Sequence, residues 1–254
     1  MRKKLSIILF ILIISIFTVA CSNKKEKDNS NVLVTLVLDK GGVNDESFNQ
    51  LAWEGAKKAS IEYGIKIKYL ESNTDADYKS NLEQAVDLDS NLIIAVGFNL
   101  SEALKEAAIY YPKSSFAIID GSFDKIPENV TNINFDEGEA GYLAGLASAK
   151  TLDGNKFGFI GGISVPAVEN YKEGFEKGLL EVNPNIELSV QYANSFSDAA
   201  KGKAIATQMY NNDINCIMSA GGGVNNGVYE VAREKGKYAV GVDMAQNYIS
   251  PKVI

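Results

Sequence analysis

Short apolar runs alternate with longer amphipathic segments from residue 32 to the end of the chain. The runs are rich in Val, Ile, Leu and aromatic residues and are continuous, which is typical of strands buried on both faces. They predict strands over 32–38, 65–70, 92–96, 116–119, 130–135, 157–160, 186–192, 214–219 and 238–242. The segments between them predict helices, among them 47–63, 78–88, 138–151, 168–181, 199–211 and 226–235. This alternation indicates an α/β fold with parallel sheets and helices on both faces.

Two helix starts carry recognisable capping residues. Ser47 is followed three positions later by Gln50, the spacing of a capping box. Ser197 and Asp198 precede an alanine-rich segment, where a small polar side chain can accept the first free N–H groups. Both support helices that begin directly after a loop.

The chain repeats a pattern in its two halves. In each half a strand leads through a polar turn to a helix in which an aromatic residue precedes a glycine: Trp53 and Gly55 in the first, Tyr171 and Gly174 in the second. Glycine inside a helix costs stability, so two matched glycines predict close helix–sheet packing in two copies.

Two observations predict two doubly wound parallel-sheet lobes: the number of residues that follow the N-terminal region, and the repeated pattern. We place the N-terminal lobe at residues 32–136 and the C-terminal lobe at 137–254. Ligands of such sheets lie at the carboxyl ends of the strands, so the site is expected in the cleft between the lobes.

The first 31 residues predict export and anchoring. A basic start is followed by an apolar run over 5–20, too short for a membrane span but of signal-peptide length. Small residues then precede Cys21, whose sulfur can accept a lipid; the alternative is an ordinary cleaved signal. Residues 21–31 are polar and charged and predict a flexible tether. We therefore expect residues 1–20 to be a signal peptide and the body to be lipid-anchored on the extracytoplasmic face of a cell membrane.

Composition excludes several classes of function. The net charge is −7, and removal of Arg2, Lys3 and Lys4 leaves 22 basic against 32 acidic residues, a net charge of −10, which disfavours nucleic acid as a partner. The chain has no histidine, so catalytic triads that need histidine and zinc sites with a histidine ligand are excluded. Cys216 lies in a buried-strand pattern and is interpreted as a core residue. No metal or cofactor is expected.

Three aspartates follow predicted strands: Asp39, Asp120 and Asp243. Each by itself is also compatible with a turn or helix cap. Converging on one cleft, they would suit the vicinal hydroxyl groups of a sugar, because carboxylates accept hydrogen bonds in pairs. Paired carboxylates can also hydrolyse a glycoside, but no partner with a raised pKa can be recognised in the sequence.

Other strand ends add apolar and glycine positions to the predicted site. Phe48 lies in a polar loop that also contains Asn49 and is either a core residue or a platform for a flat ring. Phe98 follows the third strand, and Gly222 and Val224 lie in the glycine-rich loop over 220–227. The glycines of that loop miss the spacing of a dinucleotide-binding motif, because position 226 is Asn.

Several motifs together resemble one family. They are Asp45-Glu46-Ser47-Phe48-Asn49, Trp53-Glu54-Gly55, the stretch over 134–145 that ends Leu143-Ala144-Gly145, Gly158-Phe159-Ile160-Gly161-Gly162, the stretch over 199–203, and Gly241-Val242-Asp243. The chain is similar over nearly its whole length after residue 31 to the basic membrane protein family of substrate-binding lipoproteins. The resemblance implies the type I periplasmic-binding-protein fold and the binding of purine nucleosides for ABC importers.

The resemblance also implies roles for particular residues. The base would stack on Phe48, Asp120 and Asp243 would hold the ribose, and Asp39 and Asn49 would lie on the base or rim side. The chain departs from the family because no aromatic residue stands at 222–224, where Val224 is found. The family also continues past this point, with a lysine that reaches the ligand. We therefore expect a chain cut short at its C-terminus, with exposed apolar sheet faces and weak solubility or nucleoside binding for residues 22–254 alone.

The function expected from the sequence is capture of a purine nucleoside and its delivery to an ABC transporter permease, without catalysis. Two alternatives stay open: a surface lipoprotein that interacts with a host or another partner, and a binder of another small ligand such as a sugar.

Overall fold

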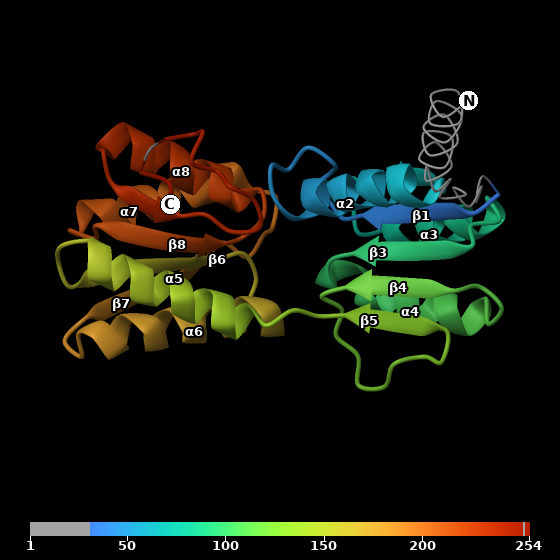
Figure 1. Cartoon of the computed structure of the whole chain (residues 1–254), viewed down its shortest axis with the longest axis horizontal. Coiled ribbons are helices and arrows are strands. Elements are labelled where there is room, and N and C mark those ends of the chain that lie inside the picture. The colour runs from blue at the N-terminus through green and yellow to red at the C-terminus, as the bar shows by residue number, and fades with distance from the viewer. Residues whose placement is uncertain (1–30, 251) are drawn as a thin grey trace, which may run out of the picture.

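Two separate parallel sheets, one in each lobe, organise the protein (Figure 1). The structure is a computed structural model, and it describes residues 31–250 and 252–254. The predicted signal peptide, Cys21 and most of the predicted tether lie outside these residues. The chain passes from the first lobe to the second between strand β5 (Val130–Ile133) and helix α5 (Glu137–Thr151), and Figure 1 shows this connection between the two lobes.

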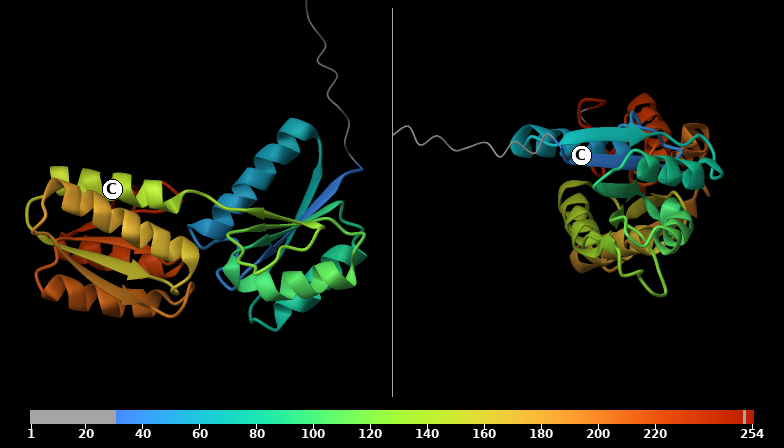
Figure 2. Two further views of the ribbon diagram at one scale, coloured as in Figure 1. Left: turned by 90° about the horizontal axis from the view of Figure 1, so that it is seen from below. Right: turned by 90° about the vertical axis from the view of Figure 1, so that its right-hand side faces the viewer.

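The first sheet has five parallel strands in the order β2-β1-β3-β4-β5. The strands are β1 (Leu33–Leu38), β2 (Lys66–Leu70), β3 (Leu92–Val96), β4 (Phe116–Ile119) and β5 (Val130–Ile133). Helix α2 (Phe48–Tyr63) packs on one face, and α3 (Asp77–Asp87) and α4 (Ser101–Tyr110) pack on the other, with a 3-10 turn at Phe98–Leu100 before α4 (Figure 2).

The second sheet has four parallel strands in the order β7-β6-β8-β9. The strands are β6 (Lys156–Gly161), β7 (Glu187–Tyr192), β8 (Cys216–Ala220) and β9 (Tyr238–Val240). Helices α5 (Glu137–Thr151) and α6 (Pro166–Val182) cover one face, and α7 (Ala199–Asn211) and α8 (Val224–Lys235) cover the other (Figure 2). None of the helices in the described residues has the length and apolar character needed to span a membrane.

The two sheets share one strand order, since β2-β1-β3-β4 corresponds to β7-β6-β8-β9. The α/β fold with doubly wound parallel sheets that the apolar pattern predicts is therefore confirmed. Two strand ends were predicted too far along the chain. β5 ends at Ile133 and β9 at Val240, because the chain leaves the sheet there; Phe135 is 63% exposed on the connection to the second lobe.

Beyond β9 the chain forms a loop and then returns to the edge of the second sheet. Ala239 pairs with Val253 in a parallel bridge, and backbone hydrogen bonds join Ala239 to Lys252 and to Ile254. Val253 is buried and packs in the cluster that α7 and α8 form on this sheet. The loop between these segments brings the chain to the boundary with the first lobe.

The matched helical glycines do not pack on the sheets, so the predicted reason for them is wrong. A Cβ atom added at Gly174 would lie 2.1 Å from the carbonyl oxygen of Gly138, so this glycine permits close contact between α5 and α6. Gly178 makes the same contact with Tyr142, one turn further on. A Cβ atom at Gly55 meets nothing within 4 Å. The two positions match in sequence but differ in environment.

Because of this difference, substitution of glycine by alanine is expected to have opposite effects on stability at the two positions. Gly55→Ala is expected to raise the free energy of unfolding by about 0.5–1 kcal/mol, because alanine is the better helix former and has room. Gly174→Ala is expected to lower it by about 1–3 kcal/mol, because the methyl group forces two helix backbones apart. Urea denaturation of both variants checks this, and equal effects of the two changes would contradict the packing.

The predicted capping box at Ser47 does not form, because Asp45 caps α2 instead. The Asp45 carboxylate accepts the backbone N–H groups of Ser47, Asn49 and Gln50 at 2.9–3.0 Å. Ser47 makes no side-chain capping bond. The second expected cap is confirmed, since the Asp198 carboxylate accepts the backbone N–H of Lys201 at 3.0 Å.

Candidate functional site

A cleft of about 520 Å³ lies between the two lobes at the carboxyl ends of their strands. It is lined by strand-end loops of both sheets, by the connection at 134–135 and by the first turns of α2 and α6. Aromatic side chains and carboxylates line it together, which is typical of sites for small ligands with a flat apolar part and polar groups.

The structure brings seven of the eight predicted ligand-binding residues to this cleft: Asp39, Phe48, Asn49, Phe98, Asp120, Gly222 and Asp243. Val224 is not among the lining residues. It is fully buried in the core of the second lobe, because it is the first residue of α8 and packs against α7, where a Cβ atom at Gly202 would touch its backbone. Cys21, the predicted lipidation site, lies outside the described residues.

Phe196 also lines the cleft, from the second lobe, and sequence reasoning missed it. The ring lies directly on the backbone of Gly162, where a Cβ atom would stand 2.3 Å from it. The carbonyl oxygen of Phe196 accepts the N–H of Gly223 at 2.8 Å. A signal was present, since the residue lies between a strand end and the recognised helix start at Asp198.

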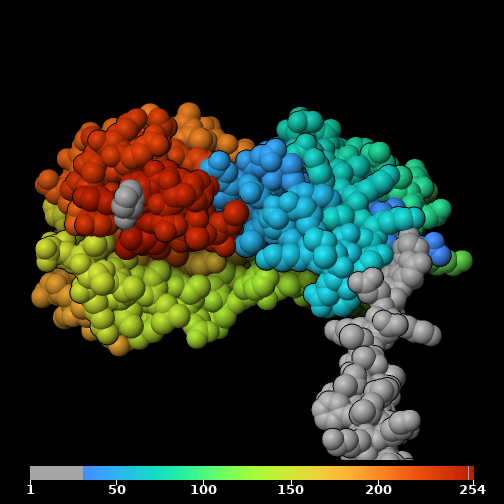
Figure 3. Space-filling view, turned by 45° about the horizontal axis from the view of Figure 1, so that its top comes forward, coloured from blue at the N-terminus to red at the C-terminus, as the bar shows by residue number. Residues whose placement is uncertain are grey.

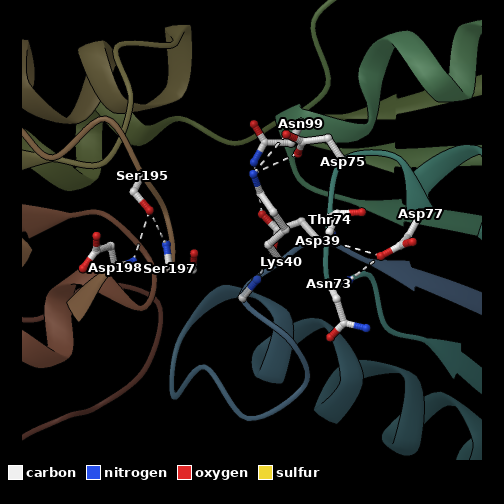
Figure 4. A network of polar contacts seen from close by, with 11 residues as sticks. Asp39, Lys40, Asn73, Thr74, Asp75, Asp77, Asn99, Ser195, Ser197 and Asp198 are labelled. Atoms are coloured by element: carbon white, nitrogen blue, oxygen red, sulfur yellow. Dashed lines mark hydrogen bonds and ion pairs between the residues drawn. The ribbon is translucent and has the colours of Figure 1, made fainter. Parts of the chain in front are cut away.

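The turn that holds Phe196 is fixed by Ser195. Its hydroxyl oxygen accepts the N–H groups of Ser197 and Asp198, each at 3.1 Å. Figure 4 shows this turn on the second lobe and, on the first lobe, the polar residues around Asp39. The aromatic side chain on the second lobe is therefore carried by a turn with defined geometry.

On the first lobe, Asn49 lies between two buried carboxylates. Its amide nitrogen donates to Asp39 at 2.8 Å and to Asp45 at 2.9 Å, and these two bonds settle which end of the amide is the oxygen. Asp39 also accepts the N–H of Gly41 at 2.9 Å and faces Asn99 at 3.4 Å (Figure 4). Burial raises the pKa of Asp39, and these donors act against that shift.

Two acceptor atoms of cleft residues lack a partner within the described part of the chain: Asn49 Oδ1 and Asp120 Oδ1. An unpaired buried oxygen costs roughly 1–3 kcal/mol. Both atoms therefore favour a ligand that carries hydrogen-bond donors. A ring N–H or amino group would suit the first atom, and a hydroxyl group would suit the second.

Asp120 and Asp243 follow the fourth strand of their respective sheets, and both adopt left-handed backbone, with φ of 55° and 68°. Such backbone is uncommon for residues other than glycine and is concentrated at functional sites. Burial, followed by the charges of Glu137 and Asp243, raises the pKa of Asp120 to about 7. Asp243 has surface open to the cleft, but the lobes on both sides withdraw solvent from its carboxyl group, which raises its pKa as well.

The raised pKa of Asp120 gives stability a pH dependence. An unfolded Asp120 releases its proton near pH 3.8, whereas the folded protein keeps it up to about pH 7. The folded state therefore binds more protons in this window, and stability falls as pH rises through it. Asp120→Asn is expected to raise Tm by a few degrees at pH 8 and to change it little at pH 4.

Thermal melts at the two pH values check this, with Asp124→Asn in the exposed loop after β4 as the control. A Tm difference of the same size at pH 4 and pH 8 would contradict the assignment. Within the described residues, no group of three or more Cys, Asp or Glu side chains is arranged to hold a metal ion.

The two-lobed α/β architecture and the cleft between strand ends define a solute-binding protein fold. Residues 32–254 match the family described as ABC transporter substrate-binding protein PnrA-like (Bmp), and the chain belongs to this family. A solved ABC transporter solute-binding protein from Aeropyrum pernix has a similar structure, with a TM-score of 0.77 and 28% identity over 88% of this chain and 65% of that one.

Two curated relatives are similar over most of the chain. The ABC transporter nucleoside-binding protein BmpA of Lactococcus lactis is 38% identical over 90% of this chain and 68% of its own length. The CD4+ T-cell-stimulating antigen of Listeria innocua is 39% identical over 87% of this chain and 65% of its own length. The chain thus spans about two thirds of the length of these relatives.

Proposed function

We propose that this protein captures a purine nucleoside in the cleft between its lobes and presents it to an ABC transporter permease. The observation that carries the proposal is the combination of Phe48 and Phe196, which line the cleft from opposite lobes, with two strand-end carboxylates in the same cleft. Membership of the family and the name of the Lactococcus lactis relative, a nucleoside-binding protein, support the ligand class.

The aromatic pair would bind the base. A purine between two aromatic rings gains roughly 1–3 kcal/mol for each stacked face. Asn49 Oδ1 would accept a hydrogen bond from an N–H group of the base, because its own amide nitrogen already donates to two carboxylates. Phe98 would complete the apolar wall on the first lobe.

The carboxylates would bind the sugar. Asp120 and Asp243 come from different lobes, so the 2′- and 3′-hydroxyl groups could each donate to one of them only when both lobes contact the ligand. Ribose binding would in this way join the two lobes. A free sugar fits the same carboxylates, but it leaves the aromatic pair without a partner.

A second candidate is hydrolysis of the glycosidic bond. No carboxyl group with a raised pKa can be recognised in the sequence, but the structure has one, since burial, followed by the charges of Glu137 and Asp243, raises the pKa of Asp120 to about 7. A neutral carboxyl group near a carboxylate is what glycoside hydrolysis uses. Chromatography of a nucleoside incubated with the protein tests this, because release of free base would show catalysis.

We further propose that the protein acts on the extracytoplasmic face of a cell membrane, anchored through lipid on Cys21 after removal of residues 1–20. The basic start, the apolar run and the small residues before Cys21 support this. The division into lobes at 32–136 and 137–254 belongs to the same proposal. The connection after β5 supports it, because the chain changes lobe there.

Mass spectrometry of the protein purified under mild conditions tests the ligand class. We expect a mass increase that matches a purine nucleoside and that disappears after denaturation and refolding. A carried molecule with no purine, such as a free sugar, would contradict the proposal.

A further inference from the structure

Ser47 has a hydroxyl group that its own helix does not use. The residue precedes α2, is 1% exposed and would ordinarily cap the helix. Asp45 takes over that role by accepting three backbone N–H groups at the helix start. The Ser47 hydroxyl is therefore available for another partner.

That partner is Asp243, 196 positions along the chain and on the other lobe. The Ser47 hydroxyl donates to Asp243 Oδ2 at 2.5 Å. Longer contacts of 3.4 Å surround this bond, from Asn226 to the carbonyl of Asp45 and from Gln246 to the carbonyl of Glu46. Figure 3 shows the same junction at the surface, where the blue segment before α2 meets the red C-terminal part of the second lobe.

Ser47 is not among the residues that line the cleft, whereas Asp243 is. The Ser47 hydroxyl therefore reaches the cleft through the Asp243 carboxylate, to which it is bonded. Ser47 engages Oδ2, and no hydrogen bond to Oδ1 is present within the described residues, so Oδ1 is left to accept from a ligand. A carboxylate held at one oxygen presents the other in a fixed direction.

We propose that Ser47 is a positioning residue, which orients the Asp243 carboxylate for the ligand and does so only while the two lobes are in contact. The inference rests on the proposed function, because it assigns Asp243 to the sugar. Recognition of the sugar by Asp243 on the second lobe would then depend on the hydroxyl group of Ser47 on the first lobe. Separation of the lobes would break the bond and free the carboxylate to rotate.

The surroundings of Asp243 make this donor important. The titratable groups that face it are Asp45 before α2, Asp120 after β4, Tyr171 on α6 and Tyr229 on α8. None of these groups is a cation. Burial raises the pKa of Asp243, and the Ser47 hydroxyl lowers it. Removal of the hydroxyl is therefore expected to raise this pKa further and to leave the carboxylate protonated at a higher pH.

Isothermal titration of the purified protein with a purine nucleoside and with its free base, between pH 5.5 and 8.5, tests the proposal. At pH 8, Ser47→Ala is expected to lower nucleoside affinity about tenfold, the loss of one hydrogen bond to a charged group, and to change base affinity little. Its affinity is also expected to begin falling at a higher pH than that of the unmodified protein. Ser47→Thr keeps the hydroxyl and should restore both properties.

Ser80→Ala, which removes an exposed serine hydroxyl on α3, is the matched control. In a double-mutant cycle, Ser47→Ala should have no further effect on nucleoside affinity when Asp243→Asn is already present. If Ser47→Ala does not fold, Ser47→Cys replaces it, because a thiol is a weak donor.

The outcomes separate this inference from the proposed function. If the unmodified protein binds no nucleoside, the proposed function fails. If it binds, and Ser47→Ala has the same affinity and pH profile, the positioning role is refuted and the function stands. Equal losses for nucleoside and free base, or a full effect of Ser47→Ala in the Asp243→Asn background, would also refute the role.

Discussion

Replacement of both Phe48 and Phe196 by leucine is expected to lower the affinity for a purine nucleoside about 100-fold, and each single change about tenfold or more. Each ring would stack on one face of the base, and the loss of one stacked face costs roughly 1–3 kcal/mol. Leucine keeps apolar volume, which matters because Phe48 also packs against β1 and α2 residues of its own lobe. Calorimetric titration of the four proteins measures the effect.

Tyr110→Leu is the control, because this ring is 77% exposed on α4 and lies outside the cleft lining. Thermal melts of the same variants show whether Phe48 belongs mainly to the core. Unchanged affinity together with a large fall in Tm would assign Phe48 to the core and remove the stacking role. If Phe48→Leu lowers the affinity and Phe196→Leu does not, only one ring stacks on the base. Stacking of the base between the two rings would then be excluded.

Asp120→Asn and Asp243→Asn are each expected to weaken purine ribosides by about tenfold or more, and to affect the free base much less. A neutral amide is a poorer acceptor for a hydroxyl group than a carboxylate, and charged hydrogen bonds are worth about 1.5–3 kcal/mol. Equal losses for riboside and base would contradict the assignment to ribose.

The same assignment gives riboside affinity a pH dependence. The pKa of Asp120 in the free protein is about 7, so its carboxylate is mostly ionised at pH 8 and mostly neutral at pH 6. Riboside affinity is therefore expected to fall as pH is lowered through 7. In Asp120→Asn this part of the pH dependence should be absent. A pH profile unchanged by the substitution would show that Asp120 does not accept from the ligand.

Much of the fold and of the site followed from the pattern of apolar runs. Strands buried on both faces are easily recognised in a sequence. Polar residues at the carboxyl ends of parallel strands lie at one edge of their sheet, and ligands bind at this edge, so Asp39, Asp120 and Asp243 could be assigned to the cleft. The ends of β5 and β9 were less predictable, because tertiary connections decide where a chain leaves a sheet.

The remaining errors concern the orientation of side chains. Val224 was placed in the cleft by its position after a strand, but the first turn of α8 directs it into the core. Phe196 was missed because its exposure to the cleft depends on its contact with Gly162, far away in the sequence. The bond from Ser47 to Asp243 joins residues of two lobes, and helix-capping rules assigned the hydroxyl to its own helix.

We propose above that the cleft binds base and ribose together. Calorimetric titration of the purified protein at pH 8 with guanosine, guanine, ribose and cytidine tests it most directly. We expect guanosine to bind at least tenfold more tightly than each of the other three. Ribose binding as tightly as guanosine, or no binding of any purine nucleoside, would contradict the account.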